Sequence, residues 1–355
     1  MMTALAHIAE ETGQPAMWIM RDVAALSFGP GRITFGDYVR MRLYDEVFWA
    51  GADRRAVAGR RRAREIAGQL NGLPPSGARG FFANPLASGA YLAAFGFPTA
   101  EVEAVYAPDL AAPGRRLLKT RDQLRDFLEG AGRRPFWGRP LAGEGGEAYA
   151  AEGAETFVVA GRTYSADAFI DHIADNCPAG YVFERRPPPA PAVEELTGEA
   201  AGRLRLVTVA TDQGPKLLRA CWRIPDGAGG EILMRLDART GEVVDGLTGE
   251  GFDMRRVARH PATGRSLWGA SIPDWSHMRA MASEAARLFP DLALAGLDMA
   301  ATAEGPMILG VDSAPDLVGH QLIDRRGILN PDFQAFVAAR REDAALIGDL
   351  ARAEG

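Results

Sequence analysis

The pattern of apolar and polar residues changes character near residue 135. Before that point, apolar residues recur at spacings typical of helices, as with Val57, Ile66 and Leu70 in residues 50–70. After it, short runs of β-branched and aromatic residues alternate with glycine- and proline-rich turns. This mixture of helices and strands predicts an α+β fold rather than an uninterrupted parallel α/β sheet.

Breaker sequences divide the chain into four parts. Asparagine, glycine and prolines at residues 71–75 end the first helical region, and the proline-rich residues 187–191 predict a stiff, extended linker. The parts are a helical N-terminal region, a small α/β segment and two α+β subdomains, at residues 1–72, 73–134, 135–190 and 191–355. The helices expected outside the first part span residues 86–95, 120–129, 167–176 and 278–289. The expected strands span residues 103–106, 136–140, 156–159, 162–164, 180–184, 204–210, 217–223, 232–237 and 242–245.

Residues 296–317 predict two apolar strands joined by a tight turn. The turn is expected at residues 303–305, because Gly305 can take the positive φ that a three-residue hairpin loop needs. This loop would place Thr302 opposite Pro306.

Each strand of this hairpin carries an aspartate. The expected register places Asp298 opposite Gly310 and on the same sheet face as Asp312. Two converging carboxylates are costly unless a cation lies between them. They therefore indicate a metal site, although ordinary strand-end and turn acids would give the same pattern.

Composition and charge exclude several classes of function. The net charge of −6 gives no general attraction to nucleic acid, and the arginine-rich run at residues 60–64 is either a local phosphate patch or a solvated helix face. Cys177 and Cys221 are too few for a disulfide framework or a zinc site. No apolar run approaches the roughly 18 residues of a membrane helix, and the N-terminal residues lack a signal-peptide pattern. We therefore expect a cytoplasmic protein that neither binds nucleic acid nor inserts into a membrane.

Six motifs follow one another in a characteristic order between residues 203 and 322. They are Arg205, Arg223, His260-Pro261-Ala262-Thr263-Gly264, Ile272-Pro273-Asp274-Trp275, Gly296-Leu297-Asp298 and Val311-Asp312-Ser313-Ala314-Pro315. Each motif is weak alone, but their order resembles that of the ATP-grasp superfamily. More narrowly, it resembles the sugar-transfer-associated ATP-grasp group, which is related to glutamate-ligase-like enzymes.

The resemblance implies an ATP-grasp fold, in which the subdomains at 135–190 and 191–355 clasp a nucleotide. It also implies ATP and Mg²⁺ as cofactors, and a carboxylate and an amine as substrates. In such enzymes the γ-phosphate passes to the carboxylate, and the amine then displaces phosphate from the acyl phosphate. This chemistry depends on positioning and charge neutralisation rather than on a protein nucleophile.

The metal ligands implied by the resemblance are Asp298 and Asp312. Asp298 matches the family's first metal-binding acid, and Asp312 falls where a Glu-x-Asn element usually places its asparagine. Gly310 falls where that element places its glutamate, so two aspartates are left to hold Mg²⁺.

Three arginines match positions that the family directs at phosphates. Arg205 and Arg223 match arginines that contact phosphate or acyl-phosphate oxygens, a role that suits the planar guanidinium, although both could instead be solvent-facing strand residues. Arg139 takes the place of a phosphate-binding lysine.

The nucleotide-binding loop and hinge are also implied. Gly143, Gly145 and Gly146 match a flap over the phosphates, although glycines in an ordinary hairpin turn would look the same. Glu184 matches the hinge that recognises adenine. Asn84-Pro85 stands where an Asp-Lys pair is usual, so a second nucleotide-facing lysine is missing.

These features predict an ATP- and Mg²⁺-dependent carboxylate–amine ligase in a glycan or peptide-modification pathway. The alternative is a degenerate ATP-grasp module that binds a nucleotide or a protein partner without catalysis. Gly310, Pro85 and a shortened loop at residues 225–230 support this alternative. The sequence defines neither the substrates nor the oligomeric state.

Overall fold

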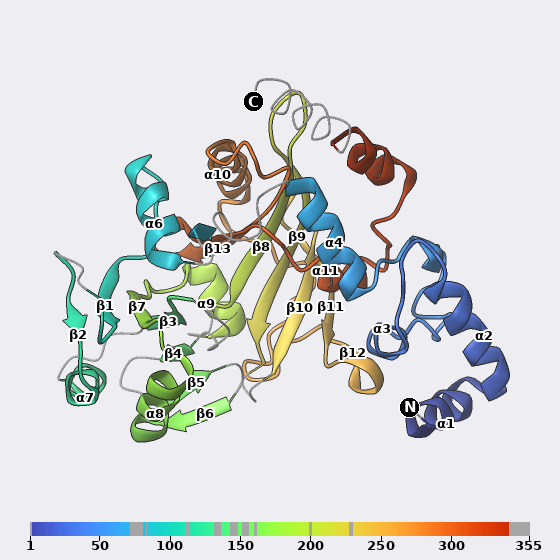
Figure 1. Ribbon diagram of the computed structural model, residues 1–355, viewed down its shortest axis with the longest axis horizontal. Helices are drawn as coiled ribbons and strands as arrows, with labels where there is room; N and C mark the ends of the chain where they lie inside the picture. The colour runs from blue at the N-terminus through green and yellow to red at the C-terminus, as the bar shows by residue number, and fades with distance from the viewer. Residues whose placement is uncertain are drawn as a thin grey trace, which may run out of the picture.

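The structure is a computed structural model of the 355-residue chain. It describes residues 2–71, 81–82, 84–110, 114–130, 136–142, 148–150, 156–159, 162–198, 201–226 and 230–340. Within these residues the chain forms two seven-stranded sheets, and helices pack on both of them (Figure 1). The N-terminal helices lie beside the second sheet, on the side away from the first (Figure 1).

The first sheet has the order β2-β1-β7-β3-β4-β5-β6, in which β1 and β2 are parallel and the other pairs antiparallel. Its strands are β1 (Val102–Tyr106), β2 (Leu117–Leu118), β3 (Phe136–Pro140), β4 (Ala148–Ala150), β5 (Thr156–Val159), β6 (Arg162–Ser165) and β7 (Tyr181–Arg185). Helices α7 (Arg121–Glu129) and α8 (Ala166–Asn176) bury their apolar residues against it. Thr120 caps α7 by accepting a hydrogen bond from the Gln123 amide.

The second sheet is antiparallel throughout its described pairs, in the order β12-β11-β10-β9-β8-β13-β14. Its strands are β8 (Arg203–Val209), β9 (Lys216–Pro225), β10 (Glu231–Leu236), β11 (Val243–Thr248), β12 (Arg255–Arg256), β13 (Leu294–Thr302) and β14 (Gly305–Asp312). Alternation along β8 gives its two faces different characters. Leu204 and Leu206 point into the main core with α9 (Pro191–Thr197) and α10 (Trp275–Arg287).

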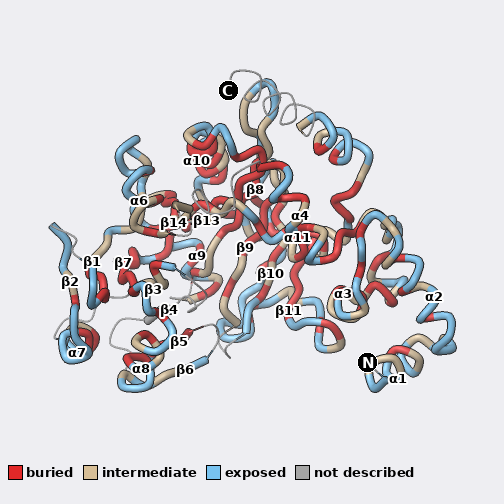
Figure 2. The backbone as a smooth tube through the Cα atoms, in the orientation of Figure 1, coloured by how far each residue is buried: buried red, intermediate tan, exposed pale blue. Residues whose placement is uncertain are grey.

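The opposite face of this sheet carries the charged residues. Arg203 and Arg205 project from β8 on that face, and α11 (Leu317–Asp324) covers the neighbouring part of β9 to β11. Figure 2 shows that buried positions concentrate in the central strands and along the inner side of α10. The charged residues therefore lie on the sheet face opposite the main core, next to the part of that face that α11 covers.

The N-terminal region is helical, as predicted, but its last helix is shorter than expected. The described helices are α1 (Met2–Thr12), α2 (Ala16–Ser27), α3 (Phe35–Arg40), the 3₁₀ turn η1 (Arg54–Ala56) and α4 (Arg60–Asn71), followed by α6 (Pro85–Ala94). The prediction of one helix over residues 50–70 was wrong, because η1 and extended residues at 57–59 precede α4. Arg61 and Arg62 pair with Glu65 on α4, so the arginine run is a solvated helix face.

The proline-rich connection lies against the hairpin of the second sheet. The Ala190 amide donates to the Ala301 carbonyl, and the Ala303 amide donates to the Pro188 carbonyl. These bonds need the extended backbone that the prolines favour, as expected. The helix α9, which starts at Pro191, was not predicted; proline suits a first helical position because its missing N–H would be unpaired there.

The hairpin pairs Asp298 with Gly310 as expected, but its loop is shorter than predicted and a β-bulge makes up the difference. Its loop is one residue shorter than predicted, because Thr302 pairs with Gly305 and not with Pro306. A register shift between Asp298 and Met299 leaves Leu309 as the extra residue of a β-bulge, and this restores the pairing of Asp298 with Gly310.

Candidate functional site

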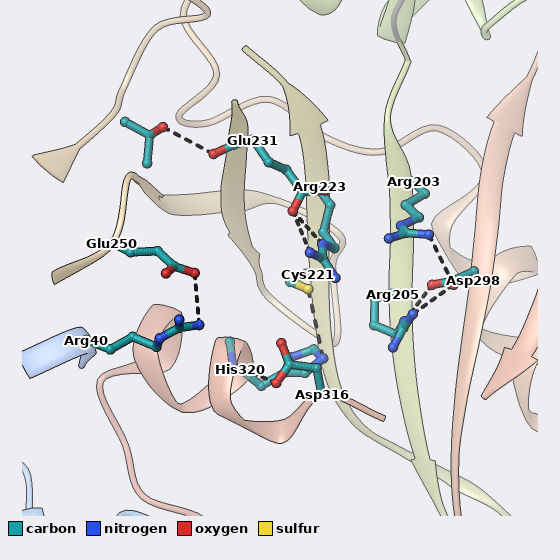
Figure 3. Close-up of polar contacts among 12 residues, drawn as sticks. Arg40, Arg203, Arg205, Cys221, Arg223, Glu231, Glu250, Asp298, Asp316 and His320 are labelled. Atoms are coloured by element: carbon teal, nitrogen blue, oxygen red, sulfur yellow. Dashed lines mark hydrogen bonds and ion pairs between the residues drawn. The ribbon is translucent and has the colours of Figure 1, made fainter. Parts of the chain in front are cut away.

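The site is built around Arg205, whose guanidinium lies between the two hairpin aspartates. Figure 3 shows its contact with Asp298. Its Nε and Nη2 donate to the two carboxylate oxygens of Asp298 at 2.5 and 2.8 Å, and its Nη1 donates to Asp312 Oδ2 at 3.0 Å. Strand pairing explains this, since Arg205 stands directly opposite Asp298 across β8 and β13. The cation between the carboxylates is therefore a side chain of the chain itself.

Every oxygen of the two carboxylates has a donor. Asp298 Oδ2 also lies 3.8 Å from Nη1 of Arg203, and Asp312 Oδ1 accepts a hydrogen bond from the Ala314 amide at 2.8 Å. Arg203 was missed from the sequence although it lies two residues before Arg205, and strand alternation places both on one face.

Burial makes this ion pair electrostatically strong. Burial alone would raise the pKa of the Asp298 carboxyl, but Arg205 and Arg203 more than offset it and hold that pKa well below its usual range. Burial alone would lower the pKa of Arg205, but Asp298 and Asp312 outweigh it and raise the pKa. Both groups are therefore charged at neutral pH.

Arg223 lies on the same face but has its own partner. It stands opposite Arg203 across β8 and β9, and its Nε and Nη2 donate to Glu231 Oε2 at 2.9 and 2.5 Å. Burial lowers and Glu231 raises the pKa of Arg223, and the net shift is upward. Glu231, at the start of β10, was not singled out in the sequence because its importance depends on the β9–β10 register.

Arg139 reaches this face from the first sheet. Its Nη2 donates to Glu184 Oε1 on the neighbouring strand β7 at 2.7 Å, and its buried Nε has no hydrogen-bond partner. A Cβ atom built on Gly310 would lie 3.0 Å from Nη1 of Arg139. The arginine therefore occupies the space that a side chain at position 310 would need.

The described residues do not fit the Mg²⁺ centre that the family resemblance implies. The four oxygens of Asp298 and Asp312 already accept hydrogen bonds, three of them from Arg205, so a Mg²⁺ ion would have to compete with a buried guanidinium for them. Gly310 supplies no third ligand, and within the described ranges no three His, Cys, Asp or Glu side chains are grouped to hold a metal.

Two buried polar residues lie beside the arginines on the same side of the sheet (Figure 3). Cys221, opposite Arg205 on β9, lies 3.9 Å from Nε2 of His320 on α11. Burial raises the pKa of the Cys221 thiol to about 12, and burial together with Arg219 lowers the pKa of His320 to about 3. Both are therefore neutral at pH 7. Their contact could not be predicted from the sequence, because the two residues are 99 positions apart.

The remaining predicted residues have structural surroundings or lie outside the described part. Gly143, Gly145 and Gly146 fall outside the described residues. Asn84 caps α6 by accepting from the Leu86 and Ala87 amides, and Pro85 is the first residue of that helix, which accounts for both residue types.

Gln321 on α11 is fully buried in the core. Its Oε1 accepts from the amides of Ala58 and Ile328 at 2.8 and 3.2 Å, and its Nε2 donates to the Ala58 carbonyl at 3.0 Å. Its contacts therefore join α11 to the N-terminal region.

A comparison with known protein families identifies one family. Residues 152–335, just over half of the chain, match the family described as sugar-transfer associated ATP-grasp. No curated protein matches the chain. In the described part of the chain, no helix combines the length and the apolar character needed to cross a membrane.

Solved structures resemble the chain at low sequence identity. An ADP complex of N5-carboxyaminoimidazole ribonucleotide synthetase is 14% identical, covers 69% of this chain and 49% of its own, and has a TM-score of 0.39. The D-alanine–D-alanine ligase of Coxiella burnetii is 11% identical, with coverages of 82% and 68% and a TM-score of 0.43. The L-amino acid ligase of Bacillus licheniformis is 10% identical, with coverages of 72% and 47% and a TM-score of 0.37. The chain thus spans about half the length of the first and third.

Proposed function

Because the chain belongs to the sugar-transfer associated ATP-grasp family, we propose that it is an ATP-dependent ligase that joins a carboxylate to an amine. The expected α+β ATP-grasp fold is confirmed. In the proposal, ATP binds where the subdomains at residues 135–190 and 191–355 face each other. Fold alone does not define a reaction, whereas the charged residues of the site limit which reactions are possible.

The observation that carries the proposal is the convergence of guanidinium groups from both sheets beside one hairpin. Arg203, Arg205 and Arg223 project from β8 and β9, and Arg139 comes from β3. Guanidinium groups donate in pairs to phosphate oxygens, and they remain charged at neutral pH. Such a set is suited to holding a polyphosphate and neutralising the charge that develops on it.

The proposed reaction has two steps. An oxygen of the substrate carboxylate attacks the γ-phosphorus, the bond to the β–γ bridging oxygen breaks, and ADP and an acyl phosphate result. The amine nitrogen then attacks the acyl carbon, phosphate leaves, and the nitrogen loses a proton to give an amide. The arginines act by position and charge, and no side chain forms a covalent bond.

A second candidate function is nucleotide binding without catalysis. The specific observation in its favour is that Asp298 and Asp312 are fully paired within the chain, and that Arg139 lies against Gly310 of the hairpin. A module of this kind would bind ATP but would not turn it over.

One experiment separates the two functions. ATP binding is measured by calorimetry, and ATP turnover is then followed with a panel of the common amino acids and hydroxylamine, which converts an acyl phosphate into a hydroxamate. Binding together with hydroxamate formation supports the ligase, and binding without turnover supports the non-catalytic module. Arg223→Gln should weaken ATP binding, whereas Arg265→Gln, which alters an exposed pair with Glu195, should not. Absence of ATP binding would contradict both.

A further inference from the structure

We infer that this site binds the phosphates of ATP through guanidinium groups alone, without a divalent metal ion. The inference rests on the proposed ATP-binding function and specifies how the same site neutralises phosphate. It starts from the misfit between the described residues and a Mg²⁺ centre.

The first support is that Arg205 satisfies the carboxylates a metal would use. It binds both oxygens of Asp298 and one of Asp312, at 2.5, 2.8 and 3.0 Å. The pair is nearly buried, with 9% and 15% of the Arg205 and Asp298 side chains exposed. A metal ion entering here would displace a buried guanidinium from its counter-ions, and an unpaired buried charge is costly.

The second support is the matched pair of Gly310 and Arg139. Glycine removes the family's central ligand, and it also leaves room for Nη1 of Arg139 at 3.0 Å from the missing Cβ. Arg139 is held there by Glu184, and its buried Nε has no partner among the described residues. Gly310 thus lacks the side chain that would bind a metal. Arg139 brings a positive charge and an unpaired N–H donor to the same place.

The third support is the balance of charge on the face. Glu184 and Glu231 each have an arginine partner, Arg139 and Arg223, and the hairpin aspartates share Arg205 with Arg203 nearby. Each of these four carboxylates therefore has a guanidinium beside it that offsets its charge without a metal. The side chains of Arg139, Arg203 and Arg223 are partly exposed, so their Nη hydrogens are the donors that can meet phosphate oxygens.

Calorimetry with ATP tests the inference in two buffers, one with EDTA and one with excess Mg²⁺. Free ATP carries two more negative charges than its Mg²⁺ complex, so a guanidinium site should bind ATP in EDTA at least as tightly as with Mg²⁺. ATP binding that requires Mg²⁺, or is at least about tenfold tighter with it, would overturn the inference and leave the proposed function intact. No ATP binding in either buffer by the folded protein would overturn both.

Variants make the test sharper. The double variant Gly310→Glu with Arg139→Lys restores the family's ligand and shortens the competing cation, so ATP binding should become tighter with Mg²⁺ than with EDTA. Arg185→Lys is the matched control, because Arg185 lies on β7 and pairs with exposed Glu304. It should behave as the wild type does and bind ATP in EDTA at least as tightly as with Mg²⁺. Titration of Mn²⁺ alone should give no binding to the wild type, and stoichiometric Mn²⁺ binding abolished by Asp298→Asn would overturn the inference.

Discussion

Arg205 and Asp298 face each other across β8 and β13 and form a two-point ion pair at 2.5 and 2.8 Å. This pair occupies the place where the sequence predicted a metal ion. It also links two central strands on the sheet face opposite the main core, so it is expected to affect stability as well as ligand binding.

Asp298→Asn should destabilise the protein by about 3–5 kcal/mol, because Arg205 would keep its charge in a buried place without its main partner. Urea unfolding measures the change. Arg205→Met combined with Asp298→Leu should regain most of the loss, since the buried charge is then gone. Glu231→Gln is the control: its pair with Arg223 is more exposed and should contribute at most about 1 kcal/mol. Equal costs for the two single variants would contradict this prediction.

His320 should make stability depend on pH. The unfolded chain takes up a proton at its ordinary pKa of 6.5, whereas the folded chain keeps His320 neutral until about 3. Between these values the unfolded state binds more protons, so the free energy of unfolding falls as pH falls, by up to about 1.4 kcal/mol per pH unit.

The measurement is urea unfolding at steps from pH 7 to pH 4. His320→Gln should reduce the slope, whereas the same change at exposed His277 should leave it as in the wild type. A slope unaffected by His320→Gln would show that other groups cause the pH dependence.

Gln321→Ala should cost about 3 kcal/mol or more. The buried amide and carbonyl of Ala58 and the amide of Ile328 would lose their partner, and each unsatisfied buried group costs about 1–3 kcal/mol. Thermal unfolding measures the loss. If Gln321 instead acted on substrate, the variant would lose turnover while keeping its melting temperature.

Replacing two glycines by alanine should change the free energy of unfolding in opposite directions. Gly305 closes the hairpin with a φ of +106°, so Gly305→Ala should destabilise by about 1–2 kcal/mol. Gly89 lies inside α6 with no atom within 4 Å of a built Cβ, so Gly89→Ala should stabilise by about 0.5–1 kcal/mol. Chemical denaturation of both variants checks the difference in sign.

Local patterns were sufficient to predict most of the strands and the facing of the hairpin aspartates. Alternation with period two fixes which residues share a face, so Asp298 and Asp312 could be grouped from the sequence. The predicted loop was one residue too long, and the bulge at Leu309 compensated for it. A bulge has no strong local signature, so this compensation could not be predicted.

The partners of the charged residues could not be predicted, because they depend on strand order. Arg205 meets Asp298 only because β8 lies beside β13, and the two residues are 93 positions apart. The pair of Arg139 and Glu184 likewise requires β3 to lie beside β7. Arg203 is different, since it could have been found from its spacing to Arg205.

The hairpin is hydrogen-bonded both to the second sheet and to segments that lead to the first sheet, and these bonds restrict the relative motion of the two sheets. Its β13 strand is hydrogen-bonded to β8, and its outer end is bonded to the backbone of residues 188–190 and to the Pro98 carbonyl. A rotation of one sheet against the other that keeps these hydrogen bonds would therefore have its axis near this end of the hairpin. Arg139 would stay close to Gly310 during such a swing, whereas β5 and β6, at the far edge of the first sheet, would travel furthest.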